Sequence, residues 1–294
     1  MLCAPLWSGC LTCGLFPILT YPTAEADSLM EDDLKLKCGW PFPAVQSSLY
    51  RYGSYAVMTV VFSGAKLLFS FEKLVILGLN QMTVVNRRTF MDALSDTSRP
   101  LITVANHRTT MDDPLVWSFF TWREFFANIR RFRYTLAAHN ICFTNIFYSK
   151  FFSLGKCIPI IRGAGVYQRG MEYCLEQLKT SQWVHIYPEG RVTPHPIRIK
   201  WGVARLIMDS PIPPLVIPIW VQNMSKVWPP NPPYYPKFGN HVTVTVGEVL
   251  DMAKYLPLLK GKTELEKRKE LADFIQGKLY ELGNTVSQIQ WIHE

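Results

Sequence analysis

Apolar and polar residues follow one another along the chain in two patterns that favour different secondary structures. Short apolar runs rich in β-branched residues are typical of buried strands, whereas apolar residues that recur every three or four positions are typical of helices. The first pattern predicts strands over residues 82–85, 101–105, 157–161, 183–187, 215–221 and 242–246. The second predicts helices over residues 113–126, 166–179, 200–208 and 263–283. This alternation predicts an α/β fold with a mixed, largely parallel sheet flanked by helices.

A long hydrophobic segment precedes the alternating part. Residues 52–71 are twenty positions with one charged side chain, Lys66, and that length could just span a bilayer. Lys66 lies deep in the run, where a lysine opposes insertion. We therefore expect an N-terminal hydrophobic helix that enters one leaflet or lies at the membrane interface, with a full span or burial in the protein core as alternatives. The predicted domains are a poorly ordered extension (1–39), a membrane-associated segment (40–80) and an α/β domain with a C-terminal helix (81–294).

The charge of the chain points to an anionic partner. Lysine and arginine outnumber acidic residues by 31 to 23, and the first 34 residues contain no basic residue, so the positive excess lies in the rest. Nucleic acid and an anionic membrane surface both attract such a protein. No nucleic-acid-binding module accompanies the short basic runs, such as residues 130–133, so we expect a membrane surface and no nucleic acid. The oligomeric state is left open.

The N-terminal residues and the cysteines predict no targeting signal, disulfide framework or metal site. Residues 11–21 are apolar but follow no basic residue, so we expect an extension rather than a secretory signal, and the segment lacks the basic character of a mitochondrial presequence. The seven cysteines are odd in number and scattered, which predicts no disulfide framework. A lone Cys10–Cys13 pair without a partner pair does not predict a metal site, and we expect neither a metal nor a cofactor.

A histidine and an aspartate follow the predicted strand 101–105, in the stretch Asn106-His107-Arg108-Thr109-Thr110-Met111-Asp112-Asp113. Five residues turn a helix through about 500°, so His107 and Asp112 cannot share one helical face. They can meet only if His107 lies in the loop and Asp112 in the first helical turn. Asp112 would then accept from one ring nitrogen and leave the other free to take a proton from an alcohol. The alternative is that the aspartate only caps a helix.

Two further blocks end at the edge of the sheet where ligands bind in α/β proteins. After the strand 183–187 comes Pro188-Glu189-Gly190-Arg191, in which glycine allows close approach of the backbone, Glu189 can accept hydrogen bonds and Arg191 offers a planar fork to phosphate. The strand 157–161 ends in Arg162. The alternatives are an ordinary Pro-Gly turn and a salt-bridged strand end.

Together with the late apolar block Val216-Ile217-Pro218-Ile219-Trp220, these stretches resemble the glycerophospholipid acyltransferase superfamily. That superfamily has an NHxxxxD block, a block ending in arginine, a PEG block and an apolar proline block in this order. Within it, the chain looks most like the tafazzin family over residues 40 to about 282. The stretches that carry this closer resemblance are WPFPA at 40–44, MDDP at 111–114, ICFT at 141–144, FFSLGKC at 151–157, GVYQ at 165–168, WVHI at 183–186, KWG at 200–202 and PYYP at 233–236.

The resemblance implies a glycerolipid acyltransferase-like fold and a phospholipid–lysophospholipid transacylase that remodels chiefly cardiolipin, using monolysocardiolipin as acceptor, without coenzyme A. It implies a mitochondrial enzyme bound to the membrane and facing the intermembrane space. His107 and Asp112 would be catalytic, and Arg162, Glu189, Gly190 and Arg191 would bind substrate. An acyl-CoA-dependent lysophospholipid acyltransferase and a non-catalytic membrane-binding scaffold are the alternatives.

Two residues depart from the pattern expected of that family. Tyr187 and Arg191 stand where FPEGK would place phenylalanine and lysine, which preserves the ring and the charge. Arg108 adds a positive charge beside His107, and we expect it to lower the pKa of His107 or to hold a lipid phosphate.

Overall fold

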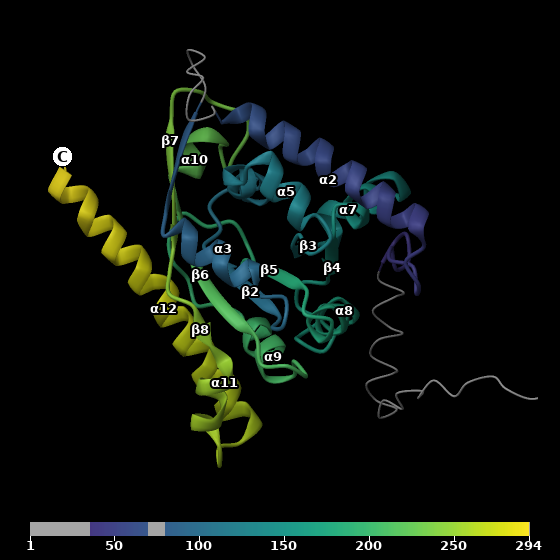
Figure 1. Ribbon diagram of the computed structural model, residues 1–294, viewed down its shortest axis with the longest axis vertical. Helices are drawn as coiled ribbons and strands as arrows, with labels where there is room; N and C mark the ends of the chain where they lie inside the picture. The colour runs from purple at the N-terminus through teal and green to yellow at the C-terminus, as the bar shows by residue number, and fades with distance from the viewer. Residues whose placement is uncertain (1–35, 70–79, 294) are drawn as a thin grey trace, which may run out of the picture.

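The computed structural model describes residues 36–69 and 80–293, the last eight of these through their backbone only. The predicted extension 1–39 and segment 40–80 fall partly outside these ranges, as do Cys10 and Cys13 and the apolar stretch 11–21, and the division into domains stays a prediction. Figure 1 shows one sheet with helices on both sides. Its strands are β1 (Gln81–Val85), β2 (Leu101–Ala105), β3 (Tyr134–Ala138), β4 (Cys157–Ile160), β5 (Trp183–Ile186), β6 (Leu215–Gln222), β7 (His241–Val246) and β8 (Leu250–Asp251).

The strands lie in the order β1-β7-β6-β2-β5-β3-β4, and β8 pairs with β6. All pairs are parallel except those that β6 makes with β7 and β8, so the predicted mixed, largely parallel α/β sheet is confirmed. In the centre, Val104 of β2 lies between Ile186 of β5 and Pro218 of β6. The carboxyl ends of these strands therefore reach the same edge of the sheet, where ligands bind in open α/β folds.

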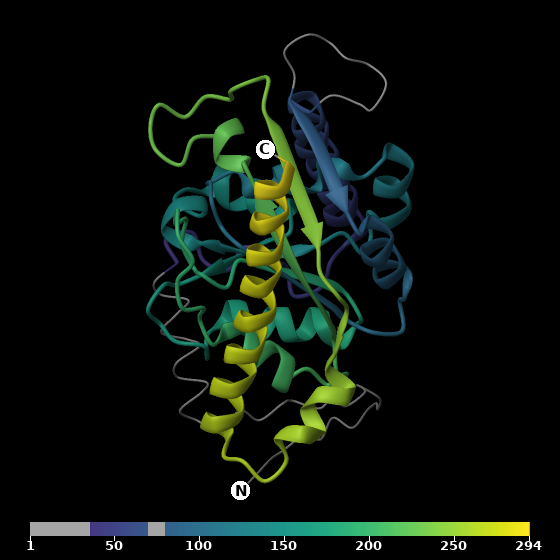
Figure 2. The same ribbon diagram turned by 90° about the vertical axis from the view of Figure 1, so that its left-hand side faces the viewer.

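Helices cover both faces of the sheet (Figures 1 and 2). One face packs against α2 (Ser48–Leu68), α3 (Arg87–Ser95), the 3₁₀ helix η1 (Val116–Phe119) and α5 (Trp122–Asn128), with Trp117 against Trp183 at its centre. The other packs against α8 (Arg169–Lys179), α9 (Gly202–Met208) and the long α12 (Glu264–His293). The remaining short helices are α4 (Asp112–Leu115), α6 (His139–Cys142), α7 (Ile146–Leu154), α10 (Met224–Val227), α11 (Met252–Tyr255) and η2 (Leu256–Leu259).

The hydrophobic segment forms α2, which packs through one side and exposes the other. Met58 and Phe62 are buried in the core, and Phe62 stacks on Phe125 of α5. Lys66 donates to the carbonyls of Ser118 and Phe120, at the end of η1, which explains how a cation fits within an apolar run. Among the residues that the structure describes, no helix combines the length and the apolar character needed to cross a membrane.

The predicted helix 113–126 is wrong as a single helix. The backbone is non-helical at Asp113, inside α4, the next turn is the 3₁₀ helix η1, and the extended backbone at Phe120 separates η1 from α5. Thr121 caps the start of α5 with a capping box: its side chain accepts from the backbone N–H of Glu124, and the Glu124 side chain accepts from the backbone N–H of Thr121. This Thr-x-x-Glu signal lies inside the predicted helix and marks the true start.

The predicted end of the last helix at Gly283 is also wrong, because α12 continues to His293. A β-carbon at Gly283 would lie 2.6 Å from the indole ring of Trp220 in β6. This glycine therefore serves close packing of a helix on the sheet, a use of glycine that competes with the helix-ending role assumed from sequence.

Candidate active site

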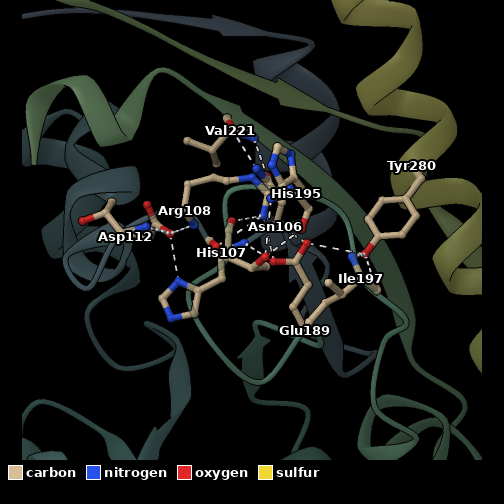
Figure 3. A network of polar contacts seen from close by, with 11 residues as sticks. Asn106, His107, Arg108, Asp112, Glu189, His195, Ile197, Val221 and Tyr280 are labelled. Atoms are coloured by element: carbon tan, nitrogen blue, oxygen red, sulfur yellow. Dashed lines mark hydrogen bonds and ion pairs between the residues drawn. The ribbon is translucent and has the colours of Figure 1, made fainter. Parts of the chain in front are cut away.

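The candidate site is built from loops that leave the carboxyl ends of β2 and β5. His107 follows β2 by two residues and Glu189 follows β5 by three, and the register of the strands places the two loops side by side. The Glu189 carboxylate accepts from the backbone N–H of His107 at 3.0 Å, so the two loops are joined directly (Figure 3).

His107 and Asp112 meet as their spacing predicts. The Nδ1 atom of His107 lies 2.8 Å from Oδ2 of Asp112, and α4 begins at Asp112, so the histidine is in the loop and the aspartate in the first turn. The same oxygen accepts from the backbone N–H groups of Arg108 at 2.6 Å and Thr109 at 3.0 Å. Because a carboxylate only accepts, Nδ1 carries the proton and Nε2 is left with a free lone pair.

An aromatic ring supports the other side of the imidazole. Tyr187 stacks on His107 with the ring centroids 4.3 Å apart and an interplanar angle of 23°. His185 packs against Tyr187 in turn, with the two rings perpendicular and their centroids 4.5 Å apart. Burial raises the pKa of Tyr187 well above its ordinary value and lowers that of His185 to about 3, so both rings are neutral supports rather than charges. The His107 ring is thus held by a carboxylate at its edge and a ring on its face.

Glu189 is fully buried and belongs to an ion pair. Its Oε2 and Oε1 atoms accept from Nη1 of Arg108 at 2.9 and 3.1 Å, and the Tyr280 hydroxyl of α12 lies 3.4 Å from Oε1. Burial raises the pKa of the Glu189 carboxyl, and the hydrogen bond from His107 and the charge of Arg108 oppose that rise. Glu189 therefore joins the two loops, and its carboxylate is surrounded by groups of the protein.

The same contacts correct the expectation for Arg108. The guanidinium also donates to the carbonyl of Thr193 at 2.9 Å and lies over the ring of Trp220, 5.4 Å from its centroid. Its side chain is only 13% exposed. Arg108 is thus a structural partner of Glu189 and is not placed to hold a lipid phosphate.

Gly190 and the two arginines predicted to bind substrate, Arg162 and Arg191, lie at the surface of the same edge of the sheet. Gly190 has φ of +71°, a conformation that L side chains rarely adopt, and the turn closes with its N–H donating to the carbonyl of Tyr187 at 3.0 Å. Arg191 and Arg162 are exposed, and no hydrogen bond or ion pair holds either one within the described part of the chain. The structure thus brings together His107, Asp112 and Glu189, with Gly190 in the adjoining turn, and leaves both arginines free at the rim.

Two contacts that position the site were not predicted. The Asn106 side chain donates to the carbonyl of Val221 at 2.9 Å and accepts from its N–H at 2.7 Å, which ties β2 to β6 (Figure 3). Asp113 accepts from Nε1 of Trp117 at 2.8 Å and from Nη2 of Arg133 at 2.7 Å, which holds the start of α4. The second Asp of the block and the arginine before β3 were visible in the sequence, but no local signal pairs them.

Comparisons with known proteins agree with this site. A family model described as Acyltransferase matches residues 81–222. A protein named Tafazzin from Drosophila melanogaster is 35% identical over 266 residues, which cover 88% of this chain and 67% of the relative. A protein named Taffazin from Dictyostelium discoideum is 38% identical over 222 residues, which cover 74% and 73% of the two chains. The chain belongs to the tafazzin family of acyltransferases.

Two further similarities fit a tafazzin-family enzyme. A protein named N-acylphosphatidylethanolamine synthase from Arabidopsis thaliana is 37% identical over 209 residues, 68% of this chain and 72% of that relative. The crystal structure of a 1-acyl-sn-glycerophosphate acyltransferase, PlsC, from Thermotoga maritima has a TM-score of 0.50 at 15% identity and covers 89% of both chains, which confirms the acyltransferase-like fold. The tafazzin-family chain is accordingly a phospholipid acyltransferase, and its substrates are lipids.

Proposed function

We propose that this acyltransferase is a transacylase that moves a fatty acyl chain from a phospholipid to a lysophospholipid without coenzyme A, and that it chiefly remodels cardiolipin in mitochondria. The observation that carries the proposal is the 2.8 Å contact between His107 and Asp112 at the carboxyl edge of the sheet, in a chain similar to tafazzins. His107 and Asp112 are its catalytic residues, and Arg162, Glu189, Gly190 and Arg191 form its substrate site, with Glu189 and Gly190 shaping it and the arginines contacting phosphate.

The chemistry follows from the free nitrogen of His107. Nε2 takes the proton from a lysophospholipid hydroxyl as the hydroxyl oxygen forms a bond to the acyl carbon of the donor ester. Asp112 stabilises the resulting imidazolium and keeps the proton on Nδ1. As the tetrahedral intermediate collapses, the bond to the donor oxygen breaks and Nε2 returns the proton to that oxygen. The sequence contains no GxSxG elbow, which favours this direct transfer over an acyl-serine.

Membrane attachment completes the proposal. The outward side of α2 exposes apolar side chains, including Leu49, Tyr52 and Leu67, while its inner side packs in the core. A helix of this kind suits attachment at the bilayer interface. We place the enzyme on mitochondrial membranes facing the intermembrane space, where the basic chain would meet cardiolipin and other anionic lipids.

A second candidate function comes from the Arabidopsis relative, whose name describes N-acylation of phosphatidylethanolamine. The same free Nε2 atom can take a proton from an amine as well as from a hydroxyl. In this case the acyl acceptor would be the headgroup amine of phosphatidylethanolamine. An acyl-CoA donor is the third arrangement that the same residues would serve.

One experiment separates these reactions. Purified full-length protein is mixed with phosphatidylcholine labelled in its acyl chain, and with either monolysocardiolipin or phosphatidylethanolamine, without coenzyme A. We expect label in cardiolipin. Label that appears only as N-acylphosphatidylethanolamine would favour the second function, and transfer that requires added acyl-CoA would replace the transacylase by the acyl-CoA-dependent enzyme.

The exposed arginines give a prediction for the substrate site. Replacing Arg162 or Arg191 with alanine should weaken the use of lysophospholipid by about 1.5–3 kcal/mol, the range for a hydrogen bond to a charged group. Lysine at either position should recover part of the loss, because the charge returns without the bidentate fork. The measurement is the dependence of the transfer rate on lysophospholipid concentration.

The melting temperature of the same variants is the control. Neither arginine makes an ion pair within the described residues, so melting should be unchanged. A lowered melting temperature with unchanged lysophospholipid dependence would make these residues structural and remove them from the site.

A further inference from the structure

The short helices α6 and α7 expose an unusual concentration of apolar side chains. Phe147 is 81% exposed, Ile141 59% and Phe151 44%, and Ile146 and Tyr148 are also exposed. We call these five residues the aromatic face. Large contiguous apolar surfaces on proteins mark sites that bind proteins, membranes or ligands. The aromatic face therefore requires an occupant.

The pattern of α7 is the reverse of an ordinary surface helix. Its buried side chains are those of Ser149 and Ser153, whereas Phe147 and Phe151, one turn apart, point outward. A helix of a water-exposed domain normally turns its apolar residues toward the core. The inner side of α7 is instead held by polar contacts to α2: the Ser54 hydroxyl donates to the carbonyl of Leu154 at 2.7 Å. Phe152 of α7 lies against the ring of Phe143, whereas Phe147 and Phe151 keep much of their surface exposed.

The charge around the aromatic face identifies the kind of surface that it meets. Residues 125–171, which contain both helices, include no aspartate or glutamate, and their seven lysines and arginines are buried only at Arg131, Arg133 and Lys156. Lys150 is exposed on α7, and Arg162 is exposed in the loop after β4. Apolar side chains flanked by cations and free of carboxylates match the interface of a membrane that contains anionic lipid.

The position of the aromatic face connects it to the site. α6 directly follows the carboxyl end of β3 and contacts β4, so it stands at the same edge of the sheet as His107. α7 packs beside α2, whose outward side is apolar as well (Figure 1). A bilayer that contacts α6 and α7 would therefore lie next to the loops that carry the catalytic groups.

From these contacts we infer that the aromatic face inserts into the interface of an anionic phospholipid bilayer and holds the carboxyl edge of the sheet against it. The inference rests on the proposed function, because a site that acts on membrane lipids must meet them at the bilayer. Phe147 and Phe151 enter the apolar boundary, and Lys150 and Arg162 lie at the depth of the phosphates. α7 is then a docking element distinct from the hydrophobic segment recognised in the sequence.

The test measures binding of the full-length protein to vesicles by flotation, with phosphatidylcholine vesicles that do or do not contain cardiolipin. The variant Phe147→Ser/Phe151→Ser should partition about 10–100-fold more weakly into both kinds of vesicle, because the bilayer interface no longer buries two aromatic side chains. Lys150→Gln should weaken binding about fivefold, and only to vesicles with cardiolipin. The matched control is Leu258→Ser/Leu265→Ser, which removes two exposed apolar side chains from η2 and the start of α12 and should bind as wild type.

Circular dichroism verifies that each variant folds. Flotation does not depend on turnover, so its result tests the inference even where the acyl-transfer experiment is negative. Wild-type partitioning by the phenylalanine variant would overturn the inference, as would an equal loss in the leucine control. A wild-type protein that is dimeric in solution, with a monomeric phenylalanine variant, would also overturn it and assign the face to a second copy of the chain.

Discussion

Replacing His107 with alanine is expected to lower the rate of acyl transfer by about 10²–10⁴-fold, the range for loss of a general base. The imidazole is held at one edge by Asp112 and on one face by the ring of Tyr187, and Nε2 points away from both. His185 is not placed to replace it, because its ring is buried against that of Tyr187. The measurement is transfer of labelled acyl chain from phosphatidylcholine to lysophospholipid at fixed vesicle composition.

The comparison with Asp112→Asn sharpens this prediction. An amide at residue 112 can still contact the imidazole but favours the wrong tautomer, so the rate should also fall strongly. Because Asp112 accepts from the amides of Arg108 and Thr109 as well, this variant should lose stability, whereas His107→Ala should melt and bind vesicles as wild type. A His107→Ala protein with activity within a few-fold of wild type would show that another group is the base.

Replacing Glu189 with alanine is expected to lower the free energy of unfolding by about 3–5 kcal/mol, the cost of leaving a buried charge without its partner. Glu189 is fully buried and Arg108 is 13% exposed at the side chain, so water reaches the guanidinium poorly once the carboxylate is gone. The backbone N–H of His107 loses its acceptor in the same variant, so transfer activity should fall too. Urea denaturation measures the first effect.

A double variant separates charge from packing. Arg108→Met/Glu189→Ala removes both charges and keeps an apolar stem over Trp220, so it should be less destabilised than Glu189→Ala alone. Equal losses in the single and double variants would mean that the ion pair does not compensate Arg108. In that case the loss of stability in Glu189→Ala would come only from the His107 backbone N–H, which has lost its acceptor.

The sequence permitted prediction of the central strands and the pair at the heart of the site for a physical reason. Buried parallel strands are continuous apolar runs, and the loops after 101–105 and 183–186 must leave the same edge. The separation of His107 and Asp112 by five residues allows contact only at a loop–helix junction, which is where α4 begins. Local pattern and chain geometry were sufficient for this part.

The missed features depend on contacts between distant residues. The sequence patterns do not predict β3, which begins after the buried Arg133. The partner of Arg133, Asp113, is twenty residues earlier, so no local pattern reveals that pair. The sequence alone suggests that Arg108 lowers the pKa of His107 or holds a phosphate, because its partner Glu189 lies on another loop, 81 residues away. The charge of a side chain shows which groups it attracts, but the fold determines whether its partner is a carboxylate of the protein or a substrate.

Asn106 shows how two neighbouring residues divide architecture from chemistry. Its amide exchanges two hydrogen bonds with the backbone of Val221, as a residue in a strand would, so a side chain supplies the last rung between β2 and β6. The backbone pairing of β2 with β6 ends at Ala105 and Ile219, and the N–H of His107 donates to Glu189. Only a side chain that both donates and accepts can complete that rung, which aspartate or leucine cannot. His107 is thus positioned by a residue that is bonded to the sheet, although His107 itself lies in the loop.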